Sequence, residues 1–205
     1  MYTIAHQAMA ARFGKVFDWK VKSKMIGLRA QDSARVMLAE LNLPLTVEEY
    51  LQQRRQILEK LFPQAEPLPG AQRLTRHLHR RGIPQAIATS SDRHDFALKI
   101  THHQEWFSIF DCLVTGDDPE LERGKPAPDI FLLAAKRMGA DPARCLVIED
   151  SPFGIEAARA AGMFSVAVPD PHMDDRAFAG AHQIIRSLND FDFSYWGLPL
   201  PDEAG

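Results

Sequence analysis

Four features are scarce or absent in this sequence, and each narrows the class of protein. The sequence has no run of about 18 apolar residues and its start lacks a signal-peptide pattern, so we expect neither a membrane span nor secretion. It also has no basic run. With 24 Lys and Arg residues against 27 Asp and Glu residues the net charge is -3, which predicts neither nucleic acid nor a membrane surface as a partner.

Cysteine is the fourth scarce feature. Only Cys112 and Cys145 occur, and both open short apolar runs. This position favours buried thiols in a reducing compartment over a disulfide, so we expect a cytoplasmic protein. The 205 residues, 45% of them hydrophobic, are enough for one sizeable globular domain and a smaller one.

The first third of the chain shows helical patterns only. Thr46-Val47-Glu48-Glu49 fits a capping box and opens an apolar stripe that continues to Leu61, and a second helix is expected over Asp32–Leu41. A proline-rich linker follows, from Pro63 to Gly70. We therefore expect an all-helical domain of residues 1–66 and a second domain of residues 67–205.

Strands and helices alternate after this linker. Short apolar runs predict strands at Ile83–Ala88, Cys112–Thr115, Phe164–Val168 and Gln183–Ile185, with helices of about ten residues between most of them. Alternation of this kind is typical of a parallel, doubly wound sheet, so the predicted class is α/β.

One further apolar run, together with the residues that follow it, gives the strongest indication of function. Leu146–Ile148 has no polar alternation, which predicts a fully buried parallel strand, and it ends directly in Glu149 and Asp150, followed by Ser-Pro and Gly154. Ligands in parallel α/β sheets collect beyond the carboxyl ends of the strands, and a carboxylate pair there suits Mg²⁺. The alternative is that both carboxylates only cap the helix that begins near Phe153.

Two other strand-end or loop features bear on this site. Thr89 follows a strand, and the backbone N–H groups of Ser90 and Ser91 can hold an anion, although the same residues also make an ordinary helix cap. Lys125 lies between a glycine and a proline and can serve as a fixed charge toward phosphate, although it also fits a solvated lysine. Together a hydroxyl, a lysine and an acidic pair supply what phosphoryl transfer requires.

These motifs resemble those of a known family. Thr89, Gly124-Lys125-Pro126-Ala-Pro-Asp129 and Glu149-Asp150-Ser-Pro-Phe-Gly154 are similar, in this order, to motifs of the haloacid dehalogenase (HAD) superfamily with a helical cap, and within it to pseudouridine-5′-phosphatase-like proteins. The resemblance implies a Rossmann-like core in which Thr89, Ser90, Ser91 and Lys125 bind phosphate, Thr89 and Lys125 take part in catalysis, and Glu149 and Asp150 hold Mg²⁺.

The resemblance also implies a feature that this sequence does not match. Family members begin with a central strand that ends in an Asp-x-Asp motif, whose first Asp is the nucleophile, and neither Asp has a counterpart here. Three explanations are open: a start placed too late or a lost N-terminus, a catalytically inactive binding module, and a motif supplied by another chain. We favour the first.

The predicted function is therefore a Mg²⁺-dependent phosphatase. Its substrate would be a small phosphorylated metabolite, such as a sugar phosphate, a nucleotide-like monophosphate or pseudouridine 5′-phosphate, hydrolysed through an aspartyl-phosphate. The resemblance implies that Gly27 and Arg29 lie in the cap loop that faces the active site in relatives, which makes them candidate substrate residues; the alternative for Arg29 is a solvent-exposed arginine. The alternatives are a beta-phosphoglucomutase-like phosphomutase and the inactive binding module, and we expect a monomer or a weak homodimer.

Overall fold

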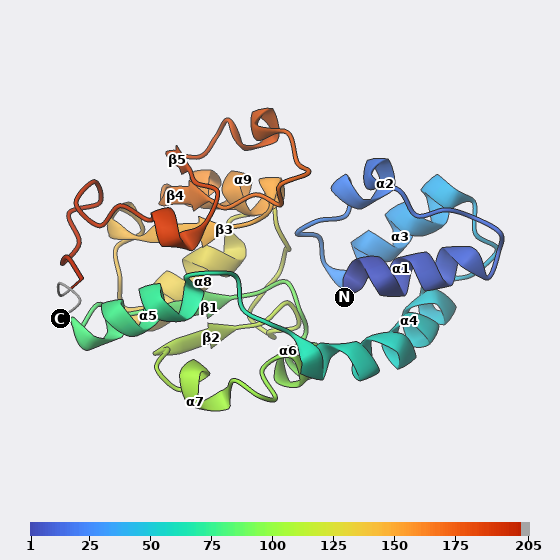
Figure 1. The fold of residues 1–205 in the computed structure, drawn as a ribbon, viewed down its shortest axis with the longest axis horizontal. Coiled ribbons are helices and arrows are strands. Elements are labelled where there is room, and N and C mark those ends of the chain that lie inside the picture. Colours follow the sequence, from blue (N-terminus) through green and yellow to red (C-terminus); the bar gives the residue numbers. More distant parts are fainter. Residues whose placement is uncertain (202–205) are drawn as a thin grey trace.

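The computed structural model describes residues 1–201. Four helices come first and lie together at one end of the molecule (Figure 1). They are α1 (Tyr2–Ala11), α2 (Trp19–Ser23), α3 (Ala30–Leu41) and α4 (Val47–Leu61). Residues 1–66 are all described and contain no strand, so the prediction of helices alone is confirmed there.

The predicted capping box starts α4. The Thr46 hydroxyl accepts from the Glu49 backbone N–H at 3.1 Å, and the Glu49 carboxylate accepts from the Thr46 N–H at 2.8 Å. The buried face of α4 is formed by Tyr50, Arg54 and Leu58, which are spaced four residues apart as one helix face requires. Arg54, a charged residue, thus lies in the middle of the buried face of α4.

The remaining elements alternate as the sequence predicts. In order they are α5 (Ala71–Arg80), β1 (Ala86–Ala88), α6 (Arg93–Lys99), α7 (Gln104–Phe107), β2 (Cys112–Val114), α8 (Asp129–Met138), β3 (Leu146–Glu149), α9 (Pro152–Ala160), β4 (Phe164–Ala167) and β5 (Gln183–Ile184). Short 3-10 helices occur at Phe62–Gln64, Pro142–Arg144, Asp175–Phe178 and Leu188–Asp190.

All described strand pairs are parallel, which confirms the predicted α/β class. They form two sheets, one of order β1-β2 and one of order β3-β4-β5. The strand predicted over Ile83–Ala88 is shorter than expected. Ile83 still donates its N–H to Leu78 in the last turn of α5, and Pro84 has no N–H, so pairing starts only at Ala86.

β3 is less buried than the sequence predicts. Val147 is buried, but Ile148 is 38% exposed. Among the described strands β3 pairs only with β4 and β1 only with β2, so each has one unpaired edge. The expectation of a fully buried strand is therefore wrong at Ile148, because such burial requires covered neighbours on both sides of the strand. The family resemblance places a further strand between these two edges.

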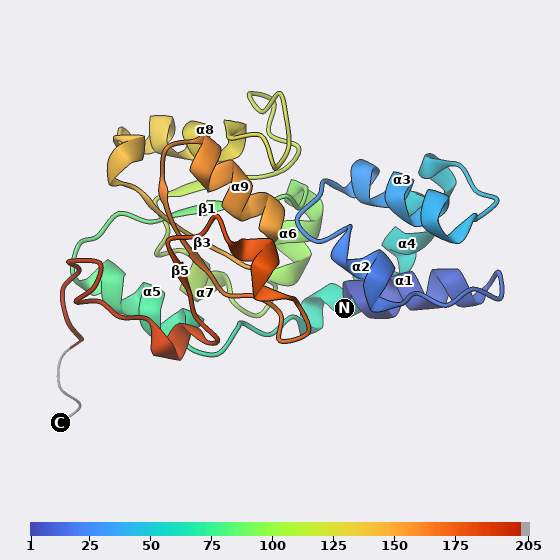
Figure 2. The ribbon, with the colours of Figure 1, turned by 90° about the horizontal axis from the view of Figure 1, so that it is seen from above.

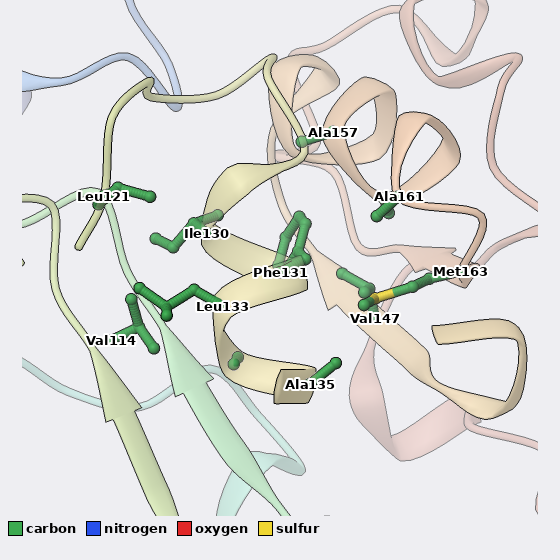
Figure 3. Close-up of a cluster of buried hydrophobic side chains, with 12 residues drawn as sticks. Val114, Leu121, Ile130, Phe131, Leu133, Ala135, Val147, Ala157, Ala161 and Met163 are labelled. Carbon is green, nitrogen blue, oxygen red and sulfur yellow. The ribbon is translucent and has the colours of Figure 1, made fainter. Parts of the chain in front are cut away.

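One buried cluster joins the two sheets. Figure 3 shows Val114 of β2 and Val147 of β3 on either side of α8, whose Ile130, Phe131 and Leu133 fill the space between them. On the other side of the strands, Leu74 of α5 belongs to a second cluster of buried hydrophobic residues. Figure 2 shows the resulting layers, with α8 and α9 on one side of the strands and α5 and α7 on the other.

The two cysteines are free, as expected, but they are only half-buried rather than buried. Cys112 opens β2, whereas Cys145 lies one residue before β3 rather than in it. No helix in residues 1–201 is both long and apolar enough to cross a membrane.

Candidate functional site

A cleft of about 500 Å³ lies between the N-terminal helices and the ends of the strands. Thr89, Lys125, Glu149 and Asp150 all line it, although they come from three separate stretches of the chain. Ser90, Ser91 and Gly27 line the same cleft. The structure thus brings the strand-end residues and the loop glycine to one place.

The threonine at the end of β1 is held by its backbone. Thr89 donates its N–H to the Val114 carbonyl at 3.0 Å, and its hydroxyl oxygen accepts from the Ser91 N–H at 3.2 Å. The two serine hydroxyls have protein partners: Ser90 donates to the Gly27 carbonyl at 3.1 Å, and Ser91 accepts from Lys99 Nζ at 2.7 Å. The Thr89 hydroxyl therefore keeps its proton for a ligand, since no described residue accepts it.

Lys125 connects the two sheets. It is 7% exposed, its peptide bond to Pro126 is cis, and its Nζ donates to a Glu149 carboxylate oxygen and to the Ala88 carbonyl at 3.4 Å. The other Glu149 oxygen accepts from the Ser151 hydroxyl at 3.0 Å. The ammonium group is therefore fixed between the end of β1 and the end of β3, and both Glu149 oxygens are engaged.

The start of α9 is capped by a serine. The Ser151 side chain accepts from the Gly154 N–H at 2.9 Å, so the cap that the alternative interpretation assigned to the two carboxylates belongs mainly to Ser151. A Cβ atom on residue 154 would lie 2.1 Å from the Glu149 carboxyl carbon. Glycine at this position is what allows α9 to begin directly against the Glu149 side chain.

Asp150 is the carboxylate that remains open to the cleft. It is exposed there, and desolvation by the neighbouring protein groups raises the pKa of its carboxyl. The neighbouring Glu149 carboxylate raises that pKa further, and Lys125 opposes the change. A like-charged pair of this kind favours either a proton or a bound cation.

The two residues predicted in the loop before α3 have different surroundings. Gly27 has φ +85°, and a Cβ atom there would lie 2.3 Å from the Ser151 hydroxyl oxygen, so the loop touches the start of α9. Arg29 is not among the residues that line the cleft. It packs over Gly124, donates to the Glu122 carbonyl at 3.4 Å and lines a neighbouring hollow.

Sequence reasoning missed several residues that line the cleft from the helical side. His6 of α1 and Arg54 of α4 are both buried and both contribute to its wall. The signal that could have found Arg54 is its spacing of four residues from Tyr50 and from Leu58. His6 has no comparable signal, because its burial depends on how α1 packs against α4.

Comparison with known proteins shows the family to which the chain belongs. A model of the haloacid dehalogenase-like hydrolase family matches residues 3–162. The chain is 45% identical over 203 residues to (DL)-glycerol-3-phosphatase 2 of Arabidopsis thaliana, covering 97% of this chain and 85% of that protein. It is 43% identical over 202 residues to a Drosophila melanogaster protein named "Probable pseudouridine-5'-phosphatase", covering 97% and 87%.

A solved structure shows a similar overall fold. The beta-phosphoglucomutase of Clostridium difficile superposes with a TM-score of 0.80 at 25% identity, covering 95% of this chain and 87% of that one.

Proposed function

Because the chain belongs to the haloacid dehalogenase-like hydrolases, we propose that its cleft binds and hydrolyses the phosphate monoester of a small metabolite. The observation that carries the proposal is the position of the Lys125 ammonium group between the ends of β1 and β3, with Thr89 and Asp150 in the same cleft. The relatives with the higher identities are named phosphatases, which favours hydrolysis over the phosphomutase alternative. Glycerol 3-phosphate and pseudouridine 5′-phosphate, named in those relatives, are the substrates to test first.

Each binding group has a distinct task in this proposal. The Thr89 hydroxyl donates to a phosphoryl oxygen, and the backbone N–H groups after it complete an anion site at the end of β1. Lys125 supplies positive charge that Glu149 holds in place. Because these groups are already ordered, they stabilise the phosphoryl charge without reorganising during the reaction.

The carboxylate pair fits a magnesium ion. Asp150 has an oxygen free to coordinate directly, whereas Glu149 is shared with Lys125 and Ser151 and would act as a weaker or indirect ligand. Among residues 1–201 no group of three or more His, Cys, Asp and Glu side chains could hold a metal ion. Mg²⁺ commonly binds through one or two carboxylates, water and phosphate oxygens, so the proposed site relies on this pair. When bound, the ion would neutralise charge on the phosphate.

The nucleophile of the aspartyl-phosphate route is not among the groups described above. We propose that residues 1–205 supply the binding and charge-stabilising part of the site, and that turnover needs the Asp-x-Asp motif that the family resemblance implies. Phosphate release by the protein purified from its source cells, with and without EDTA, would test this step.

We also propose that residues 1–66 act as a cap over residues 67–205. Polar contacts join the two parts: Arg55 pairs with Asp92 at 3.2 Å, and Lys99 Nζ donates to the Tyr2 hydroxyl at 2.8 Å. Contacts of this kind can break and re-form, as opening and closing over a substrate requires.

Phosphate binding gives a test of the proposal that does not depend on turnover. Lys125→Met should weaken binding of inorganic phosphate, measured by calorimetry, by about tenfold or more, because it removes the charge at the anion site. Lys136→Met, at an exposed lysine paired with Glu120, is the matched control and should bind like the wild type. Equal affinities for the wild type and Lys125→Met would contradict the proposal.

A further inference from the structure

Arg54 is a buried cation at the wall of the cleft. It is 5% exposed, it lies on the inward face of α4, and it lines the same cleft as Thr89 and Lys125. Those two residues belong to the strand ends and the loop before α8, whereas Arg54 comes from the helices on the opposite side. A ligand that fills the cleft would therefore face Lys125 on the side of the strand ends and Arg54 on the side of the N-terminal helices.

Arg54 has no hydrogen-bond or ion-pair partner within residues 1–201. Among the described residues none of the ion pairs or hydrogen bonds includes Arg54, and its Nε is buried without a partner. Its neighbour Arg55, by contrast, pairs with Asp92 at 3.2 Å. Buried arginines are normally paired, because taking a charge out of water without a partner is costly.

The surroundings of Arg54 do not replace a partner. The rings of Tyr2 and Tyr50 lie 5.9 and 6.0 Å from its guanidinium carbon, at the outer limit of a cation–π contact. His6 is held neutral and adds no negative charge. Asp95 of α6 lines the cleft and interacts with Arg54 electrostatically, but no ion pair joins the two side chains.

We propose that Arg54 is a specificity residue, which donates hydrogen bonds to oxygen atoms on the part of the phosphate ester that is not transferred. The inference rests on the proposed function, because it assumes that the phosphoryl group lies at Thr89 and Lys125. It names the substrate class more closely: esters whose leaving group carries hydroxyl, carbonyl or carboxylate oxygens. Plain alkyl phosphates lack the acceptors that a guanidinium recognises.

The test compares two ligands of equal carbon number. Glycerol 3-phosphate carries two hydroxyls that propyl phosphate lacks, so the ratio of their affinities reports on recognition away from the phosphorus. In magnesium buffer the wild type should bind glycerol 3-phosphate about tenfold more tightly, the ratio that one hydrogen bond to a charged donor supports. Arg54→Met should bring this ratio close to one and leave propyl phosphate affinity within about twofold of the wild type.

Two further variants sharpen the measurement. Arg54→Lys keeps the charge but loses the planar fork of donors, so its ratio should fall between those of the wild type and Arg54→Met. Arg35→Met is the control, since Arg35 is an exposed arginine of α3 paired with Asp32, and its ratio should equal that of the wild type. Arg54→Lys also keeps the test decisive if Arg54→Met does not fold.

Thermal unfolding without ligand separates binding from a structural role. If Arg54 is unpaired until a ligand binds, Arg54→Met should unfold at the same or a higher temperature than the wild type, because a buried cation without a partner has been removed. If Arg54 only holds Tyr2 and Tyr50 in place, the variant should unfold at a lower temperature and keep the wild-type affinity ratio, and this pair of results would overturn the proposal.

The two proposals fail in different ways. If neither inorganic phosphate nor propyl phosphate binds the wild type, the proposed function is wrong, and so is the role proposed for Arg54. If both bind but the wild-type ratio is one, or Arg54→Met leaves it unchanged, only the role of Arg54 is wrong.

Discussion

Acidification should destabilise this protein through one histidine of α1. His6 is 4% exposed and shares a hydrogen bond with the Tyr50 hydroxyl. Burial, and then the positive charge of Arg54, lower the pKa of His6 from 6.5 to about 3. The folded protein therefore keeps this imidazole neutral at pH values where the unfolded chain takes up a proton.

The sign and the size follow from proton linkage. Between pH 3 and 6.5 the unfolded state binds more protons at His6 than the folded state does, so the free energy of unfolding decreases as the pH falls through this window. The full difference between the two pKa values corresponds to about 5 kcal/mol, and the part developed between pH 8 and pH 5 to about 2 kcal/mol.

The assay is urea unfolding at pH 8 and pH 5, followed by tryptophan fluorescence. His6→Gln replaces the titrating ring with a neutral polar side chain, so the loss of stability between the two pH values should be about 2 kcal/mol smaller than in the wild type. His79→Gln, at an exposed histidine of α5, is the control and should keep the wild-type loss. If His6→Gln shows the same loss as His79→Gln, the assigned origin of the acid sensitivity is wrong.

Two substitutions test the local structure around the site and the helices. Gly154→Ala should destabilise the protein by about 1–3 kcal/mol in urea unfolding, because the new methyl group overlaps the Glu149 carboxyl, whereas Gly180→Ala, with its nearest neighbour at 3.6 Å, should have little effect. Thr46→Ala should cost about 1 kcal/mol, since it removes the hydroxyl that caps the Glu49 N–H; an unchanged unfolding midpoint would show that the cap contributes nothing.

The sequence predicted the local features of the fold because local chemistry determines them. The capping box at Thr46 needs only two side chains three residues apart, and the strand that leads to Glu149 needs only an apolar run that ends in a charge. It could not predict the exposure of Ile148, because that depends on which strands pair along both edges of β3.

The same distinction explains which residues of the candidate cleft could be predicted. Thr89, Lys125 and Asp150 follow strands or lie between a glycine and a proline, and such positions can be read along the chain. Arg54 lies inside a helix, where a charged residue is usually solvated, and its burial beside Tyr2 of α1 and Tyr50 depends on how the helices pack.

The positions of these residues also separate two kinds of recognition. The groups at Thr89 and Lys125 suit any phosphate, because a phosphoryl group presents the same oxygens in every ester. A residue that distinguishes one ester from another must contact the remainder of the molecule, and the helices across the cleft supply Arg54 there. Substrate choice in this chain should therefore change through the helices and leave phosphate affinity intact.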